Sequence, residues 1–402
     1  MTIRLLAEKA TRWLCILLPW ATFGYGVRLA IGPLPTTGLE LVLLGVFGLF
    51  TLARGWAGWQ EAWRALPSRW LLVAWIMVGF VAALYSPAML KGLGLWRAFL
   101  LEPVLALAIV NVVLTTKQDR DQLRMSLWTS VMFVSVWALI EFVTGWGIPH
   151  PWNVSIAEGR RATGPYGFPN AVALFAAPIV AYAGAWAMKE RDRLALALAV
   201  LGFAGMVAVR SDGGMLAVLA AWGMALLAFA WGRWVVGAGT VAVGSLLALL
   251  PALREVVWKE LTFQGWSGKV RLIMWGETWE MLKANWVLGA GMAGYPLVFD
   301  AFHKKRFIEI FQYPHQLVYN AWSEVGIIGL VLFLGLLLTW ALRAYRSSTD
   351  WRHRVIGLAP LVAVIVHGLV DVPYWKNDLT VIFFLLWWLA GERKTRSTVS
   401  EL

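Results

Sequence analysis

Long apolar runs alternate with short polar segments along almost the whole chain. A run of about 17 to 25 apolar residues is long enough to cross a hydrocarbon core of about 30 Å as an α-helix. Because backbone groups inside a bilayer must find their hydrogen bonds within the segment, each run is expected to be helical. The pattern predicts an all-α, polytopic integral membrane protein with about 12 transmembrane helices. The runs lie at 13–31, 37–53, 70–85, 95–114, 125–145, 169–188, 194–209, 215–231, 234–250, 316–341, 355–372 and 377–391.

Two of these runs could be misinterpreted. The run at 13–31 follows a basic N-terminal segment and so looks like a signal peptide. No small-residue cleavage site follows it and further spans do, so we expect it to be kept as a membrane anchor. Only Gly232 and Arg233 separate the eighth and ninth runs, which we interpret as two helices rather than one.

One connection breaks the alternation. Residues 251–315, a segment of about 65 residues, separate the ninth and tenth runs and far exceed an ordinary helix connection. The tryptophans and other apolar residues of this segment argue against disorder. Arg271, Trp275 and Trp279 recur at near-helical spacing, which predicts an amphipathic helix over 269–284 at the outer membrane face. We therefore expect three parts: nine transmembrane helices in 1–250, an outer loop at 251–315, and three transmembrane helices with a cytoplasmic tail in 316–402.

Composition supports a membrane protein and bears on its partners. The chain has 402 residues, 60% of them hydrophobic and 14% charged, with a mean hydropathy of +0.67. These values are typical of a polytopic membrane protein rather than a soluble domain. The net charge of +12 could suggest nucleic acid, but most basic residues fall in the segments that are inside if the N-terminus is cytoplasmic. This asymmetry predicts that both termini are cytoplasmic and argues against a nucleic-acid partner. The lone Cys15 rules out a disulfide framework and a cysteine metal site.

Residues 289–294 match the pattern GxGxxG letter for letter. A dinucleotide site needs this motif between a strand and a helix of a βαβ unit, whereas here a predicted helix precedes it inside a membrane-protein loop. We therefore interpret Gly289 and Gly291 as parts of a turn that reverses the chain or brings backbone N–H groups near a ligand. The basic cluster Lys304-Lys305-Arg306, further along the loop, is interpreted as a solvated or lipid-headgroup-binding face.

Three groups of residues, in this order along the chain, resemble the bacterial O-antigen ligase and O-antigen polymerase superfamily of membrane glycosyltransferases. Individually each motif is weak, and their order makes them more specific. The number of spans and the late outer loop also fit, so that the resemblance covers most of the chain. A further arginine, Arg210, occupies the place of the arginine that the family carries at the outer end of a middle helix. The chain has Gln316 where the family commonly has asparagine. The three groups are Arg160 to Asn170 before a mid-chain helix, Arg271 with Trp275, Gly289 and Gly291, and His315 with Glu324-Val325-Gly326 and Gly329.

The resemblance implies an enzyme of the bacterial inner membrane with its active site on the periplasmic side. It implies transfer of a glycan from an undecaprenyl diphosphate carrier to an acceptor hydroxyl, without a nucleotide sugar, a metal or another cofactor. The leading hypothesis is the ligase that joins the glycan to the lipid A core. The alternatives are a polymerase of O-antigen or exopolysaccharide, a protein O-oligosaccharyltransferase of the same superfamily, and a transporter. A transporter typically shows internal repeats around a midplane site, and no repeat is evident here.

The residue types fit this chemistry independently of the resemblance. Arginines stabilise the charge that develops on a leaving diphosphate, which makes Arg271 and Arg210 the catalytic candidates, with Arg160 or Arg161 as a third. His315 is the candidate base for the acceptor hydroxyl. Each has an alternative interpretation: an arginine at a membrane interface can simply anchor the helix, and a histidine before a helix can be a capping residue. The candidate substrate-binding residues are Arg160, Arg161, Asn170, Trp275, Gly289, Gly291, His367 and Asp371.

Four further polar residues are expected within the predicted spans. His367 and Asp371 stand at i and i+4 near the outer end of the eleventh span, so they share a face and either bond each other structurally or shape the acceptor site. Glu102 and Glu141 are carboxylates within predicted spans, which are unfavourable unless paired, and Arg97 is a candidate partner.

The charge asymmetry predicts the topology directly. Arg271 and His315 should lie outside, and residues 189–193 inside. In intact cells, a membrane-impermeant thiol reagent should label a Lys305→Cys variant and leave an Arg191→Cys variant unlabelled. The reverse labelling pattern would overturn this topology.

Overall fold

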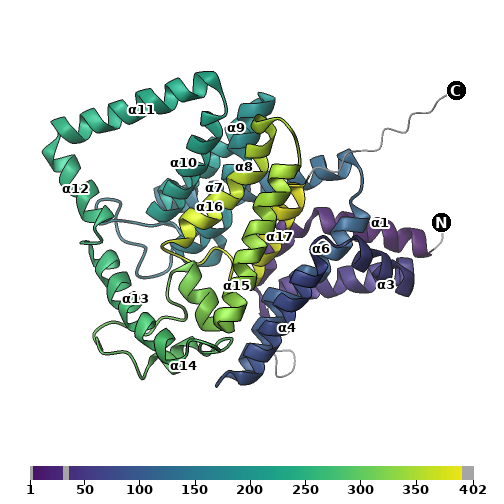
Figure 1. Cartoon of the computed structure of the whole chain (residues 1–402). Helices are drawn as coiled ribbons and strands as arrows, with labels where there is room; N and C mark the ends of the chain where they lie inside the picture. The colour runs from purple at the N-terminus through teal and green to yellow at the C-terminus, as the bar shows by residue number, and fades with distance from the viewer. Residues whose placement is uncertain (1–2, 30–35, 392–402) are drawn as a thin grey trace.

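Helices form nearly all regular elements of the computed structural model, which describes residues 3–29 and 36–391 (Figure 1). Within those residues the strands Arg28–Leu29 (β1) and Thr36–Thr37 (β2) form a single short antiparallel pair. The predicted all-α class is confirmed. The predicted cytoplasmic tail lies almost wholly outside the described residues. The long helices of the N-terminal half are α1 (Ile3–Ile16), α3 (Gly38–Ala65), α4 (Arg69–Tyr85), α5 (Met89–Trp96), α6 (Glu102–Val113), α7 (Lys117–Thr144) and α8 (Pro169–Glu190).

The C-terminal half continues with helices of similar length and then shorter ones in the outer loop. Short helical segments also connect the longer elements: α2 (Leu18–Ala21), the 3-10 turns Thr22–Gly26 and Gly164–Tyr166, and the π-helical turn Arg97–Leu101. The remaining helices are α9 (Arg193–Ala208), α10 (Asp212–Leu227), α11 (Ala230–Leu249), α12 (Pro251–Leu261), α13 (Trp266–Ala284), α14 (Tyr295–Phe299), α15 (Leu317–Arg346), α16 (Trp351–Gly368) and α17 (Asn377–Leu389).

Six of the described helices are long and apolar enough to cross a membrane. They are the helical stretches Gly38–Ala65, Met89–Val113, Lys117–Thr144, Pro169–Glu190, Ala230–Leu249 and Leu317–Arg346. Four shorter apolar helices accompany them: Arg69–Tyr85, Arg193–Ala208, Asp212–Leu227 and Asn377–Leu389. The chain is thus an all-α membrane protein, and the count of about 12 spans stays a prediction.

The predicted bounds of the first span are wrong. Instead of one helix over 13–31, α1 starts at Ile3 and ends at Ile16, and the chain then passes through the short α2 and a 3-10 turn. Pro19 explains the break, because proline lacks a backbone donor and is tolerated only in the first turn of a helix, where it stands in α2. Residues 30 and 31 of the predicted span lie outside the described residues.

The junction of the eighth and ninth runs also differs from its prediction. The break falls at Ala228 and Phe229, and Gly232 lies within the first turn of α11 rather than between the helices. A side chain at position 232 would collide with the carbonyl of Leu226 at the end of α10. Glycine is therefore needed here for close packing of the corner, not for breaking a helix.

Helix α8 is the most buried long helix and organises the centre of the bundle. It packs against α9, α10 and α16, and small residues line two of these contacts. Alanines let helix backbones approach closely, which is how helices associate within a membrane, where burial from lipid supplies little driving force. The alanines at these contacts are Ala181, Ala185, Ala217, Ala221, Ala225, Ala359 and Ala363.

Buried carboxylates within the bundle are paired, as expected. Arg97 lies 3.1 Å from carboxylate oxygens of both Glu40 and Glu102, which confirms its predicted pairing with Glu102. The Glu141 carboxylate accepts hydrogen bonds from the backbone N–H groups of Thr163 and Gly164, at 2.7 and 2.8 Å. This second contact ties the end of α7 to the loop that leads into α8. It thereby fixes the segment that carries Arg160 and Arg161.

The long outer loop folds into three helices. A helix, α13, occupies the predicted residues, and its buried face packs on α14 and on the first half of α15. Its placement at the outer membrane face stays a prediction. Glu277 of α13 contacts His303 at 2.8 Å, and its other oxygen accepts from the backbone of Lys304 and Lys305. The preceding α11 and α12 lie away from the bundle, with nearly all of their side chains exposed (Figure 1).

A break in α15 seats this loop against the bundle. Gly326 has φ +68 and ψ −177, so the helix is interrupted there. The backbone of the loop enters the break, where Ile327 N–H donates to the Val287 carbonyl at 3.0 Å. A side chain at Gly326 would collide with that same carbonyl. Glycine is required at this position both for its φ and for the close approach.

We predict that Gly326→Ala destabilises the protein by about 1–3 kcal/mol or more, because alanine is strained at positive φ and would push the loop away. Thermal unfolding of the purified protein in detergent measures this. Gly276→Ala is the matched control, since Gly276 lies within α13 and a side chain there meets nothing. Equal unfolding temperatures for the two variants would contradict the assigned role of Gly326.

Candidate active site

Helix α13 holds together the two loops that carry the candidate chemistry. The Trp275 indole donates to the Pro314 carbonyl at 2.9 Å, directly before His315. One turn earlier, Arg271 Nε donates to the Val370 carbonyl at 3.1 Å, directly before Asp371. The helix thus contacts the start of α15 and the segment that follows α16. Arg271 and Trp275, the two α13 residues predicted to belong to the site, thus position its loops by binding loop carbonyls.

His315 occupies a strained position at the start of α15. Its φ is +47, in the left-handed region, and its ring lies between Phe311 and Tyr313 at centroid distances of 5.2 and 4.6 Å. Strained backbone of this kind is often found at functional sites. The next residue, Gln316, caps α15 by accepting from the Tyr319 N–H at 2.6 Å. Gln316, which stands where the family commonly has asparagine, therefore has a structural role as the cap of α15. The His315 ring is not needed for capping.

The partner of His315 is Asp371. Nδ1 of the imidazole lies 3.3 Å from Asp371 Oδ1, and the other carboxylate oxygen accepts from the Asn170 amide at 3.1 Å. The Asp371 side chain is 2% exposed and the His315 side chain 21%. The carboxylate is therefore buried, whereas part of the imidazole is accessible to solvent. Asp371 lies beyond the end of α16. Burial raises the pKa of its carboxyl, but the hydrogen bond and charge of His315, with His367 and Lys376, lower it to about 2.

The network continues from Asp371 to an arginine. Arg161 Nη2 donates to the Asn170 amide oxygen at 2.8 Å, and its Nε donates to the Val209 carbonyl at 2.9 Å. The guanidinium also stacks over Trp152, at 5.0 Å from the ring centroid. One chain of hydrogen bonds therefore joins Arg161, Asn170, Asp371 and His315. These residues come from three segments of the chain that are far apart in sequence.

Three of the predicted arginines lie close enough to act on one another. Burial lowers the pKa of Arg161, and the positive charges of Arg271 and Arg210 lower it further, while Asp212 opposes them. Arg210 stands in the turn between α9 and α10 with φ +48, and its Nη2 donates to the Ile156 carbonyl at 3.1 Å. Like charges brought together repel unless an anion joins them. The cluster of Arg161, Arg210 and Arg271, next to His315, is therefore suited to a phosphate-bearing ligand.

A known protein family matches a segment of the chain that includes part of this cluster. Residues 197–334 match the O-antigen ligase family model. The predicted resemblance to the O-antigen ligase superfamily is confirmed by this match. The segment contains Arg210, Arg271 and His315, whereas Arg161 and Asp371 lie outside it. No curated protein matches the chain.

Outside residues 197–334, the structure distinguishes the two adjacent arginines. Arg160 points away from the cluster, and donates from Nε to the Val154 carbonyl at 2.8 Å and from Nη1 to the Phe142 and Val143 carbonyls at 3.1 and 3.2 Å. These last two carbonyls belong to the final turn of α7, so Arg160 caps that helix. A substrate contact by Arg160 stays a prediction, and the arginine brought to the cluster is Arg161.

Within residues 197–334, Gly289 and Gly291 contact protein backbone. A side chain at Gly289 would collide with carbonyls of α15, and one at Gly291 would lie 2.8 Å from the Ala82 carbonyl at the end of α4. Between them, Ala290 N–H donates to the Ser323 carbonyl at 2.7 Å. The turn reverses the chain, as one of the two interpretations expected. Binding of substrate by these glycines stays a prediction.

His367 belongs to the same region but lacks the expected side-chain partner. Its ring is 2% exposed and faces Gly213 and Gly214 at the start of α10. No described residue forms a hydrogen bond with its Nδ1. Asp371 N–H donates to the His367 carbonyl at 3.0 Å, so the helical spacing reaches Asp371, but its carboxylate binds His315 and Asn170. Among the described residues, no side-chain hydrogen bond joins His367 to Asp371. A role of His367 in the acceptor site stays a prediction.

Several contacts of the cluster were not identified from the sequence. Tyr313 lies against His315, and burial together with the charge of Asp371 raises the pKa of its hydroxyl above its ordinary value. Its position two residues before His315 was the available signal. Trp152 and Asp212 carried no recognisable pattern. The described residues contain no group of three or more His, Cys, Asp or Glu side chains placed to hold a metal ion.

Proposed function

We propose that this protein is an O-antigen ligase, a glycosyltransferase that moves a glycan from undecaprenyl diphosphate to the lipid A core oligosaccharide at the periplasmic face. The observation that carries the proposal is the His315–Asp371 pair, with Arg161 bonded to Asn170, a partner of Asp371, and Arg271 bonded to the carbonyl directly before Asp371. The family match to residues 197–334 supports the enzyme class. The match does not distinguish the acceptor, which the experiments below address.

The arginine cluster receives the donor diphosphate. As the bond between the anomeric carbon and the diphosphate oxygen breaks, its electron pair moves to that oxygen and negative charge develops there. Arg161, Arg210 and Arg271 offset this charge, and loss of one such donor typically raises the barrier by about 3–4 kcal/mol. Arg271 uses Nε and Nη1 in contacts with Val370 and Ser267, which fix the guanidinium while its Nη2 stays available. The proposal assigns the neutralising role to these side chains and uses no metal or other cofactor.

The His315–Asp371 pair activates the acceptor hydroxyl. With Nδ1–H donated to the ionised Asp371 carboxylate, the second ring nitrogen, Nε2, carries the lone pair. Nε2 takes the acceptor proton while the hydroxyl oxygen forms its bond to the anomeric carbon, in a single inverting displacement. Asp371 stabilises the imidazolium that results. Asn170 and Arg161 hold Asp371 in place, so that they are positioning residues for the base.

The other predicted site residues enter the proposal as parts of its framework. Trp275 holds the loop before His315 against α13. Gly289 and Gly291 let the outer loop approach α15 and α4. We assign Arg160 to the loop that presents Arg161, and His367 to the floor of the acceptor region next to α10.

A polymerase or a protein glycosyltransferase of the same superfamily would use the same centre. The single dominant outer loop of this compact chain favours the ligase. The deciding experiment is incubation of purified protein with lipid-linked glycan and, in parallel, lipid A core, a carrier-linked acceptor or an acceptor protein. Sugar transferred to lipid A core supports the ligase, and transfer only to another acceptor would replace it.

For the donor, we predict that Arg271→Ala and Arg210→Ala each lower the turnover rate by at least about 10²–10³-fold while folding is kept. Lysine at either position should restore little, because it lacks the planar fork of donors that matches a diphosphate. Arg306→Ala is the control, since Arg306 is an exposed arginine of the same loop that pairs with Asp300. Near wild-type turnover of both Arg271 variants would refute the diphosphate role.

For the base, we predict that His315→Ala loses about 10²–10⁴-fold in turnover and still binds the lipid-linked donor. Because His315 takes the acceptor proton in this proposal, the dependence of turnover on pH should change when His315 is replaced. The measurement is turnover against pH for wild type and His315→Gln, with donor binding measured in parallel. An active His315→Gln variant with an unchanged pH profile would reduce His315 to a positioning residue.

A further inference from the structure

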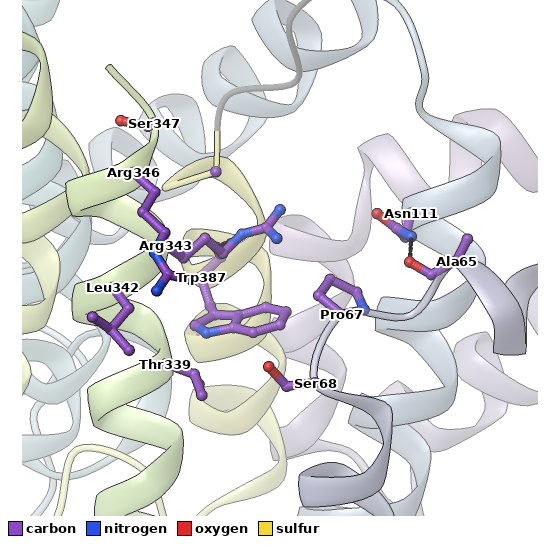
Figure 2. A pocket seen from close by; sticks show the side chains of 11 residues that line it. Ala65, Pro67, Ser68, Asn111, Thr339, Leu342, Arg343, Arg346, Ser347 and Trp387 are labelled. Atoms are coloured by element: carbon purple, nitrogen blue, oxygen red, sulfur yellow. Dashed lines mark hydrogen bonds between the residues drawn. The ribbon is translucent and has the colours of Figure 1, made fainter. Parts of the chain in front are cut away.

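The arginines of the bundle bind backbone carbonyls in two different settings. At the end of α15 remote from His315, Arg343 lies beside Trp387 in a hollow of about 430 Å³ and donates to the Trp387 and Trp388 carbonyls at 3.1 and 3.3 Å (Figure 2). These carbonyls belong to the last turn of α17, so the contact is part of the packed bundle. The arginine cluster of the candidate site also donates to carbonyls, but one of the acceptors lies in an exposed loop.

Arg210 is the member of the cluster that binds this loop. Arg161 and Arg271 donate from Nε to carbonyls that directly precede other residues of the site. Arg210 donates from Nη2 to the Ile156 carbonyl at 3.1 Å. Ile156 lies in the connection between α7 and α8, so its carbonyl comes from a segment that supplies no other acceptor to the cluster.

Residues 152–159 form a loop that is bonded mainly to itself. Arg161 N–H donates to the Trp152 carbonyl at 3.3 Å and closes the loop. Ser155 N–H donates to the Glu158 carboxylate at 2.9 Å, and Glu158 N–H donates back to the Ser155 hydroxyl at 3.2 Å. Most side chains of the loop are exposed. A segment with few buried apolar contacts opens at a low cost in free energy, so this loop can move as a unit.

Arg210 holds the tip of the loop on the bundle. Within the part of the chain that the structure describes, its bond to Ile156 is the hydrogen bond that joins the loop to α9, α10 and the turn between them. The loop also covers the neighbouring Arg161, whose guanidinium lies 5.0 Å from the centroid of the Trp152 ring. It therefore contacts two of the three arginines of the cluster.

The Ile156 carbonyl occupies a donor that a diphosphate needs. A guanidinium binds two oxygens at once through paired donors, and Nη2 takes part in both pairings, with Nε and with Nη1. A phosphate oxygen accepts the same N–H as a carbonyl oxygen, in a stronger bond because both partners are charged. The loop and a diphosphate therefore compete for Arg210.

We propose that the loop at 152–159 is an autoinhibitory latch, which binds Arg210 until a diphosphate displaces it. The displacement rests on the proposed function, because it requires a diphosphate at Arg210, whereas the contact of the loop with Arg210 does not. A ligand must bind this arginine more strongly than the Ile156 carbonyl does. The latch thereby favours a diphosphate held by several arginines over a single phosphate held by one.

The first test follows the loop with a spin label on Ala157→Cys, an exposed position, in purified full-length protein in detergent. The native Cys15 is buried. The label should be restricted without ligand, and mobile in Arg210→Ala or after inorganic pyrophosphate is added. Arg306→Ala, which removes an exposed arginine paired with Asp300, is the matched control and should leave the label restricted. A label that stays equally restricted in folded Arg210→Ala would overturn the latch.

The second test weakens the latch from the loop side. Gly159 has a φ of +103, where alanine is strained, so Gly159→Ala displaces the tip without changing Arg210. This variant should bind pyrophosphate about tenfold more tightly in titration calorimetry, the factor expected when one competing hydrogen bond to a charged group is lost. Gly147→Ala is the control: φ there is +77, and a side chain would lie 3.8 Å from the Glu141 carboxylate. Unchanged or weaker binding in folded Gly159→Ala would overturn the competition.

The outcomes separate the latch from the proposed function. If pyrophosphate does not bind the wild-type protein, the diphosphate role of the cluster is wrong and the displacement fails with it. The mobility of the label in Arg210→Ala then still decides whether the loop is held by Arg210. Inorganic phosphate that releases the loop as readily as pyrophosphate would refute the preference for a diphosphate.

Discussion

The candidate site depends on the burial of one carboxylate, that of Asp371. An ion this deeply buried is stable only when its oxygens are hydrogen-bonded or paired. Asp371 meets this requirement with His315 from the start of α15 and Asn170 from the start of α8. The same contacts that stabilise the carboxylate therefore also set the orientation of the imidazole. Glu141, which binds the loop leading to Arg161, extends this principle to the arginine side of the site.

Much of this arrangement was accessible from the sequence, and the remainder was not for identifiable reasons. Hydrophobic periodicity predicted the helices and α13, and the placement of charged residues at one face predicted that Arg210, Arg271 and His315 belong together. Periodicity says nothing about irregular backbone, however. It could not choose between Arg160 and its neighbour Arg161, whose directions depend on the path of the loop. Helical spacing placed His367 and Asp371 on one face, but it could not show that the Asp371 carboxylate binds His315 and Asn170, which come from other segments.

The two ends of the bundle present different chemistry through the same kind of side chain. At the end that carries His315, arginines gather around an irregular, polar segment. At the other end, Arg343 is fixed against the carbonyls of α17 and next to an apolar surface. Arginine suits both places, because its planar guanidinium presents several donors in a fixed geometry to carbonyl or phosphate oxygens. Helix α15 contributes to both, so that it is the structural link between the two faces.

Because of the break at Gly326, the orientation of the site does not depend on the helical register of the membrane-spanning part of α15. In an unbroken α-helix, each added residue turns everything beyond it by about 100°. Here the segment 317–325 is held by the loop through Trp286 and Ala290, whose backbone groups bond Trp322 and Ser323. An insertion or deletion in the inner half of α15 would therefore leave the imidazole of His315 facing the same way. The length of this membrane-spanning segment can therefore change without altering the orientation of the candidate site.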